Sequence, residues 1–294
     1  MLIAIVGGNL QGVEATYLAH KAGWEVLVID RSPVVPAKGF CDQFLQLDVV
    51  REKNLDRALK GVDLVMPALE NDEALGHLAK LTRNSDLPFA FDPNAYSISS
   101  SKMKSDRLFA QTKVPTPLPW PECGFPVLAK PDAGSGSQGV MVLNDSESFS
   151  GQAFKPTDHW VLQEFIQGPS YSIEIIGTLA RYVPLQVTDL SMDEVYDCKR
   201  VLAPTDLSDA RISDFEQISI SLAKALKLKG LMDVEVILHE NSLKVLEIDA
   251  RLPSQTPITV YWSSGLNMVR MLGDLFLNKF NQKRIKPNSP RGVV

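Results

Sequence analysis

Short apolar runs alternate with helical patterns in the first third of the chain. Runs of strand length predict β-strands over 2–6, 25–29, 44–47, 64–67 and 89–91. Between them, apolar residues at helical spacing predict helices over 13–22, 54–59 and 73–81. An alternation of strand and helix indicates βαβ units, in which helices cover the faces of a parallel sheet. We therefore expect an α/β domain with a Rossmann-like sheet over residues 1–93.

The pattern changes after residue 93. A polar stretch with two lysines opens a helix that runs to Ala110, and four prolines over 114–121 then predict an extended crossover. Beyond the crossover, turns separate most of the expected strands, which cover 127–130, 139–143, 160–165, 172–177, 182–187, 232–238 and 243–248. A helix over 214–226 precedes the last two strands. This pattern indicates antiparallel pairing, and we expect an α+β fold for residues 94–294.

Composition places the chain among ordinary globular proteins. Its 294 residues suggest about two domains, and 45% hydrophobic with 22% charged residues permits a large core. Thirty Lys and Arg residues against 35 Asp and Glu give a net charge of −5, which disfavours a general binder of nucleic acid or acidic membranes. Charged residues interrupt the apolar segment 261–277, so no membrane span is expected. The first residues are typical of a strand and not of a signal peptide, which predicts a cytoplasmic protein. The three cysteines are widely spaced, so neither disulfides nor a zinc site is expected.

The glycine-rich turn after the first strand is only a partial dinucleotide motif. A Rossmann fingerprint needs G-x-G-x-x-G and an acidic residue about 20 positions later. Here Gly7, Gly8 and Gly12 leave Asn9 in the position of the second fingerprint glycine, although Asp30 has a suitable spacing. A side chain at residue 9 would crowd a pyrophosphate. We therefore favour a structural turn, and a dinucleotide-dependent oxidoreductase remains the weaker alternative.

A lysine and a Gly/Ser loop follow the expected strand over 127–130. Lys130 ends this strand, and the loop that comes next contains Gly134, Ser135, Gly136 and Ser137. Small residues let backbone N–H groups approach phosphate oxygens, and the lysine adds a point charge for the same anion. The segment is not a Walker A motif. An ordinary hairpin loop beside a surface lysine is the alternative.

Two late strands carry acidic residues at alternate positions. Asp233 and Glu235 are two residues apart, as are Glu247 and Asp249, so each pair lies on one face of its strand, with Arg251 on the face of the second pair. If the strands are neighbours, the carboxylates converge and repel one another unless a cation joins them. Oxygen ligands of this kind suit Mg²⁺ bound to substrate phosphates. The alternative is an exposed sheet face with alternating charge.

The order of these motifs resembles that of the ATP-grasp superfamily of carboxylate–amine ligases. The resemblance covers nearly the whole chain and implies a pre-ATP-grasp domain over 1–93 and an ATP-grasp domain over 94–294, with a small lid subdomain over about 113–166. It implies that Lys102, with Lys104 as a near competitor, and Lys130 hold the phosphates of ATP under the loop 134–139. It also implies that Glu164 and Ile166 contact adenine. Glu235 and Glu247, with Asp249 where most members have Asn, are the implied Mg²⁺ ligands.

A narrower resemblance is carried by Gly-Gly-Asn-Leu-Gln-Gly near the start and by Asp-Ala-Arg-Leu-Pro-Ser-Gln-Thr-Pro over 249–257. These segments are similar to the ligase family of pyrrolysine biosynthesis, although this chain ends earlier than that family leads us to expect. The resemblance implies that (3R)-3-methyl-D-ornithine is activated as an acyl phosphate and joined to the ε-amine of L-lysine. Another amino-acid or peptide substrate pair is the alternative, and a non-catalytic nucleotide-binding regulator is a further one. A homodimer is a family expectation.

Residue roles in this reaction follow from the resemblance and from charge. Arg251 is the expected catalytic cation, since it could stabilise the transferring phosphoryl group and the later oxyanion. Amino-acid substrates bring ammonium groups, which need carboxylates, and carboxylates, which need N–H and hydroxyl donors. The expected substrate contacts are Glu70, Ser172, Glu174, Tyr196, Asp197, Asp233, Ser254, Gln255 and Thr256. No general base is indicated by the sequence.

Overall fold

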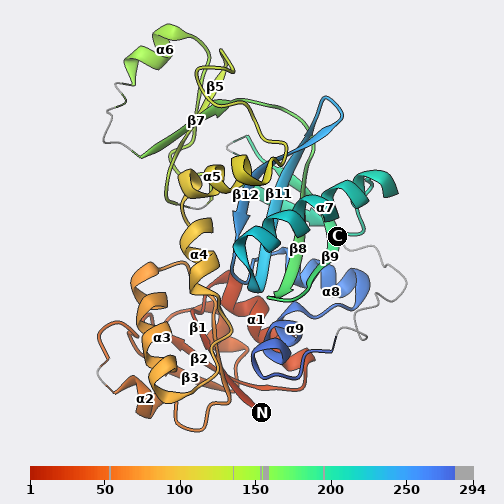
Figure 1. The fold of residues 1–294 in the computed structure, drawn as a ribbon. Helices are drawn as coiled ribbons and strands as arrows, with labels where there is room; N and C mark the ends of the chain where they lie inside the picture. Colours follow the sequence, from red (N-terminus) through yellow and green to blue (C-terminus); the bar gives the residue numbers. More distant parts are fainter. Residues whose placement is uncertain (53, 135, 153, 155–158, 195, 282–294) are drawn as a thin grey trace. The chain divides into compact units, whose positions relative to one another are not determined.

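The computed structural model describes residues 1–52, 54–134, 136–152, 154, 159–194 and 196–281. By their contacts, these residues form two compact units, which are described separately here. The first unit contains the described residues among 1–93 and 229–231 together with residues 251–281. The second unit contains residues 94–228 and 232–250. The helices and strands are labelled in Figure 1.

A parallel four-stranded sheet forms the centre of the first unit. Its strands are β1 (Leu2–Val6), β2 (Glu25–Asp30), β3 (Gln43–Gln46) and β4 (Leu64–Pro67), in the order β3-β2-β1-β4. The helical elements before residue 93 are α1 (Leu10–Lys21), η1 (Pro36–Gly39), α2 (Leu55–Ala58) and α3 (Asp72–Ser85). The α/β prediction for this region is confirmed. The strand expected over 89–91 is wrong, because Phe89 makes only an isolated bridge to Val65.

Two helices late in the chain also belong to the first unit. These are α8 (Thr256–Ser264) and α9 (Met268–Phe276), neither of which was predicted. The side chain of Asn267 caps α9 by accepting from the Arg270 N–H, and its amide donates to the Leu18 carbonyl of α1 at 2.7 Å. This contact ties the late helices to the first one. No helix in the described part of the chain is long and apolar enough to cross a membrane.

The second unit contains two antiparallel sheets, as the sequence predicts. The larger has the order β10-β9-β8-β11-β12, and the smaller has the order β6-β5-β7. The larger sheet comprises β8 (Ser170–Thr178), β9 (Tyr182–Met192), β10 (Cys198–Leu202), β11 (Lys229–His239) and β12 (Ser242–Asp249). The smaller comprises β5 (Val127–Pro131), β6 (Met141–Leu143) and β7 (Trp160–Glu164). The helices are α4 (Pro93–Ser99), α5 (Lys102–Thr112), α6 (Ser146–Gly151) and α7 (Asp209–Leu226).

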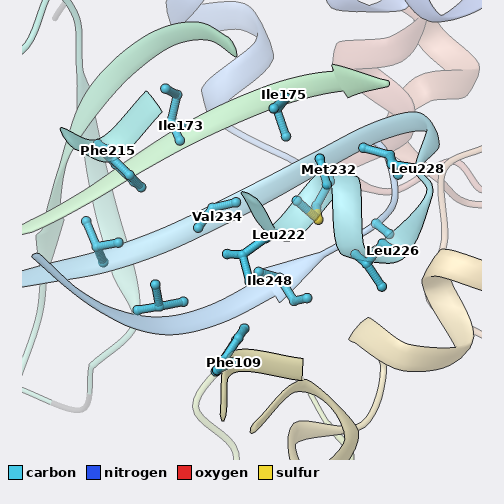
Figure 2. Close-up of a cluster of buried hydrophobic side chains, with 14 of the residues drawn as sticks. Phe109, Ile173, Ile175, Phe215, Leu222, Leu226, Leu228, Met232, Val234 and Ile248 are labelled. Atoms are coloured by element: carbon cyan, nitrogen blue, oxygen red, sulfur yellow. The ribbon is translucent and has the colours of Figure 1, made fainter. Parts of the chain in front are cut away.

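One apolar core supports the larger sheet. Figure 2 shows Phe215 and Leu222 of α7 with Ile173 of β8 and Val234 of β11, and all four side chains are fully buried. Phe109 of α5 joins the same cluster. Because successive side chains on a strand point to opposite faces, the residues between these apolar ones face the other side of the sheet. That other face carries the polar residues of the candidate site.

Candidate active site

The glycine turn after β1 is explained by packing within the first unit. A Cβ atom on Gly7 would lie 2.2 Å from the Ala68 carbonyl oxygen, and Gly7 also has a φ of +108°. The two carboxylate oxygens of Asp30 accept the N–H groups of Gly8 and Ser32, each at 2.8 Å. Asp30 therefore closes the turn itself. This geometry favours the structural interpretation over the dinucleotide alternative.

A cavity of about 940 Å³, including its open mouth, lies within the second unit. Both sheets contribute to its wall, and so does the loop after β5. Its apolar lining includes Leu128, Val140, Ile166, Met192, Ile237 and Leu246. Its polar lining includes Lys102, Lys130, Gly134, Gly136, Ser137, Gln163, Glu164, Tyr196, Glu235 and Glu247. An apolar cleft with a few converging polar groups is the usual form of a small-molecule site.

The structure separates the two candidate lysines of α5. Lys102 lines the cavity, where its Nζ donates to the Gly134 carbonyl at 2.8 Å and lies 3.3 Å from Glu247 Oε1. Lys104 instead donates to the Ser97 carbonyl at 2.9 Å. The two side chains differ because residues two apart on a helix face different directions. Lys102 therefore lies at the cavity, and Lys104 does not line it.

Lys130 is a buried cation at the base of the cavity. Its side chain donates to the Leu246 carbonyl at 3.1 Å, and the residue is 6% exposed. Burial lowers the pKa of Lys130, whereas the charges of Glu247, Asp106 and Glu235 act to raise it. Burial also raises the pKa of Asp106 on α5, against the opposing effect of Lys130. Sequence analysis missed Asp106, because only the fold brings α5 close to β5.

Asp132 connects the two lysine-bearing elements. Its carboxylate accepts from Ser101 Oγ and from the Met103 N–H, each at 2.8 Å, and its carbonyl accepts from the Lys102 N–H at 3.0 Å. The first turn of α5 is thereby fixed to the residue two positions after Lys130. Asp132 was not predicted, and no sequence pattern marks it, since its role depends on a contact across about thirty residues.

The Gly/Ser loop lies at the cavity, and so do Glu164 and Ile166. Ser137 Oγ donates to the Tyr196 carbonyl at 2.7 Å, so the loop contacts the turn between β9 and β10. Ser135 lies outside the described residues. The Glu164 carboxylate accepts from Lys244 Nζ at 2.8 Å and from the Leu118 N–H at 3.1 Å. Burial acts to raise the pKa of Glu164, but these two bonds lower it overall.

The two acidic strands, β11 and β12, are neighbours in the sheet, which is the condition for their carboxylates to converge. In the antiparallel register of β11 and β12, Glu235 lies opposite Glu247 and Asp233 lies opposite Asp249. Only the two glutamates line the cavity. Asp233 is buried, and Ser172 Oγ of the neighbouring β8 donates to its carboxylate. The four carboxylates therefore divide into a glutamate pair at the cavity and an aspartate pair further along the strands.

The glutamate pair fits Mg²⁺ only together with substrate phosphates. Among the described residues, no three His, Cys, Asp or Glu side chains are close enough to form a ready-made metal site. Mg²⁺ commonly takes one or two carboxylates and completes its shell with phosphate oxygens and water. Two facing glutamates beside Lys102 and Lys130 match this donor set. The residues present therefore suit a metal that arrives with a nucleotide.

Arg251 is not on the strand face where it was expected. β12 ends at Asp249, two residues before Arg251. In the first unit, the Arg251 guanidinium pairs with Glu70, with 2.5 Å between Nη2 and Oε1, and donates to the Leu252 carbonyl at 3.2 Å. Two of the expected site residues are thus partners of one another.

The remaining expected substrate contacts differ in burial. Glu174, on β8, is fully buried, and so is Ser172 on the same strand. Asp197 is half-buried and pairs with Lys199 at 2.6 Å. The chain leads into α8 of the first unit through Ser254, Gln255 and Thr256. Gln255 is the residue before the helix, and Thr256 is its first residue.

Glu14 of α1 is a buried carboxyl group that sequence analysis missed. It is 6% exposed, and its Oε2 accepts from the Gln255 N–H at 2.7 Å. Burial raises its pKa to about 7, although the bond from Gln255 acts in the opposite direction. The folded protein therefore holds this proton more tightly than the unfolded chain does.

We expect Glu14→Gln to stabilise the protein relative to wild type by more at pH 8 than at pH 5. The raised pKa makes folding less favourable as pH rises from about 4.5 to 7, and glutamine does not titrate. The difference in unfolding free energy between variant and wild type should therefore be about 2–3 kcal/mol larger at pH 8. Urea unfolding of both proteins at the two pH values measures it. The same pH dependence in both proteins would contradict the burial of a titrating Glu14.

Comparisons with known proteins agree with this geometry. Residues 99–255 match the model of an ATP-grasp domain, and residues 3–87 match a PylC-like N-terminal domain. A 3-methyl-D-ornithine–L-lysine ligase from Methanosarcina acetivorans is 39% identical over 92% of this chain and 72% of that protein. The ligase of the same name from Methanosarcina barkeri is 37% identical over 98% of this chain and 77% of that protein.

Solved structures share the fold at low sequence identity. An N5-carboxyaminoimidazole ribonucleotide synthetase from Thermotoga maritima superposes with a TM-score of 0.75 at 20% identity, covering 98% of this chain and 77% of that one. A biotin carboxylase domain from Hydrogenobacter thermophilus, solved with MgADP, superposes with a TM-score of 0.81 at 17% identity, covering 97% of this chain and 72% of that one. These matches support the fold alone. Together with the family model and the Methanosarcina relatives, they show that the chain belongs to the ATP-grasp family of ADP-forming carboxylate–amine ligases.

Proposed function

We propose that this chain joins 3-methyl-D-ornithine to the ε-amine of L-lysine, in the pathway that makes pyrrolysine. The observation that carries the proposal is the similarity to ligases of that name across more than nine tenths of the chain. The reaction consumes ATP and free amino acids, so we place it in the cytoplasm. A family-like homodimer would have a solution mass of twice 32.4 kDa, which light scattering measures.

The first step would be activation of the methylornithine carboxylate. A carboxylate oxygen attacks the γ-phosphorus of ATP, the bond to the bridging oxygen breaks, and ADP leaves. Such a transfer asks the protein mainly to position the reactants and neutralise charge. Lys102 and Lys130 are proposed to hold the phosphates, and Gly134, Gly136 and Ser137 to cover them. The apolar wall of the cavity, with Glu164 and Ile166, is proposed to hold adenine.

The metal site is proposed on β11 and β12. Glu235 and Glu247 would hold Mg²⁺, with Asp249 as a further candidate. The ion would neutralise charge on the transferred phosphoryl group. The proximity of Lys102 Nζ to Glu247 supports this assignment, because it shows that positive charge is accommodated next to this carboxylate. Arg251 is proposed to stabilise the later oxyanion.

The second step would be amide formation. The lysine ε-amine attacks the carbonyl carbon of the acyl phosphate, inorganic phosphate leaves, and the nitrogen releases a proton to solvent or to a base that we do not assign. The buried Glu174 and Asp233 are proposed partners for substrate ammonium groups. Gln255 and Thr256 are proposed donors to a substrate carboxylate.

The proposed function is tested by ADP release and product mass together. The assay contains ATP, Mg²⁺, L-lysine and D-ornithine as a stand-in for the methylated substrate, with each amino acid omitted in turn. We expect ornithine-dependent ADP and a product with the mass of ornithine plus lysine less one water. ADP release with another pair of amino acids, and none with this pair, would replace the substrates and keep the ligase. Product from this pair without ADP release would overturn the mechanism.

A further inference from the structure

The residues before α8 form a strained turn. Gln255 has a φ of 69° and a ψ of −49°, and the Thr256 N–H donates to the Ser254 carbonyl at 2.9 Å. These features define a γ-turn of the rare kind with positive φ, which is unfavourable for a residue with a side chain. A conformation of this kind persists only where surrounding contacts hold it, and it is most common at functional sites.

Two side chains of α1 hold this turn in place. The Gln11 amide donates to the Leu252 carbonyl, and the Glu14 carboxylate accepts from the Gln255 N–H at 2.7 Å. Gln11 and Glu14 are three residues apart on a helix, so they lie on one face, and both are buried. From the other side, Thr259 Oγ1 donates to the Gln255 carbonyl at 2.9 Å. The N–H and the C=O of the strained residue are therefore both fixed.

The turn presents a buried hydroxyl group. Thr256 is 5% exposed, and within the described residues its Oγ1 has no hydrogen-bond partner. Buried polar atoms almost always have a partner, so an exception of this kind needs an explanation. The hydroxyl lies at the N-terminus of α8, where the positive end of the helix dipole favours negative charge. A carboxylate would accept from this hydroxyl.

We propose that Glu14 and Gln11 are positioning residues for an amino-acid substrate, holding the turn at 254–256 so that Thr256 donates to the substrate carboxylate. The inference rests on the proposed function for the identity of the substrate. It also gives the helix after the glycine turn a role. In place of a dinucleotide, this helix binds the loop that follows the metal-binding strand.

The first test is hydrogen exchange, which needs no substrate. Glu14→Leu removes the acceptor for the Gln255 N–H, so exchange in the peptide over 252–259 should become at least about tenfold faster. Glu14→Gln keeps an acceptor oxygen and should remain close to wild type. Thr16→Val is the matched control, since Thr16 is buried on the same helix but donates within it, to Gly12. Unchanged exchange in Glu14→Leu would overturn the proposal, whatever the substrates are.

The second test is steady-state kinetics with D-ornithine and L-lysine. We expect Glu14→Leu to raise the KM for one amino acid about tenfold, with the dissociation constant of ATP unchanged and the Gln variant restoring most of the loss. If Glu14→Leu does not fold, Gln11→Leu removes the hydrogen bond from Gln11 to the Leu252 carbonyl instead, and it should also raise the KM for one amino acid. A Leu variant with wild-type KM values would overturn the positioning role. An absence of product from wild type would instead overturn the proposed function, and the exchange test would still decide the role of Glu14.

Discussion

Glu247→Gln is expected to reduce kcat by a factor on the order of 10²–10³ while ATP still binds. Gln keeps the shape and one oxygen of the side chain but removes the charge that faces Glu235 across the β11–β12 pair. Mg²⁺ would then lose a charged ligand just where negative charge develops on the phosphoryl group. Single-turnover ADP formation measures the chemical step, and nucleotide titration measures binding separately.

The same hairpin offers a control for Glu247. Glu240 is exposed at the turn between the two strands and does not line the cavity. Glu240→Gln makes the same change in charge and should leave kcat within about twofold of wild type, since exposed charges contribute little. Raising the Mg²⁺ concentration should partly restore Glu247→Gln and have no effect on the control. Full activity of Glu247→Gln at low Mg²⁺ would remove the metal assignment.

The motifs of the second unit were predictable because each is local in sequence. Alternation places Asp233 with Glu235 and Glu247 with Asp249 on strand faces, and the pairing of β11 with β12 then brings the two sets together. Lys130 at the end of β5 was found in the same way. The residue ranges assigned to the domains and to the lid stay predictions, as do the roles of all these side chains.

Other site features could not be predicted, because they depend on contacts between distant segments. Glu14 and Gln11 look like ordinary polar positions of a helix until residues 252–256 lie against them. Asp106 on α5 and Asp132 after β5 likewise gain their roles from the contact between this helix and this strand. The error at Arg251 had another origin. Alternation was extended past Asp249, where the strand ends, so the side chain of Arg251 was assigned to a strand face that does not reach it.

Lys130→Met is expected to lower kcat/KM for ATP by a factor on the order of 10²–10³. Met has a similar length and fills the buried volume, but it supplies no charge to the phosphates and no donor to the Leu246 carbonyl. The substitution should also destabilise the protein, by about 1–2 kcal/mol, because Asp106 loses the cation that lowers its pKa. The loss should be larger at pH 8 than at pH 5, because the raised pKa of the Asp106 carboxyl favours its neutral form as the pH falls. Urea unfolding at the two pH values measures it.

The double variant Lys130→Met with Asp106→Asn separates the two effects. Removing both charges leaves no charged Asp106 without its cation, so the part of the stability lost through Asp106 should return, as it does when both partners of a buried charge pair are replaced. Activity should not return, because the phosphates of ATP still lack their buried cation. If the double variant regained both stability and kcat/KM, Lys130 would act only by compensating Asp106, and its proposed contact with ATP would be wrong. If it regained stability alone, the loss of activity would be due to the missing charge in the cavity.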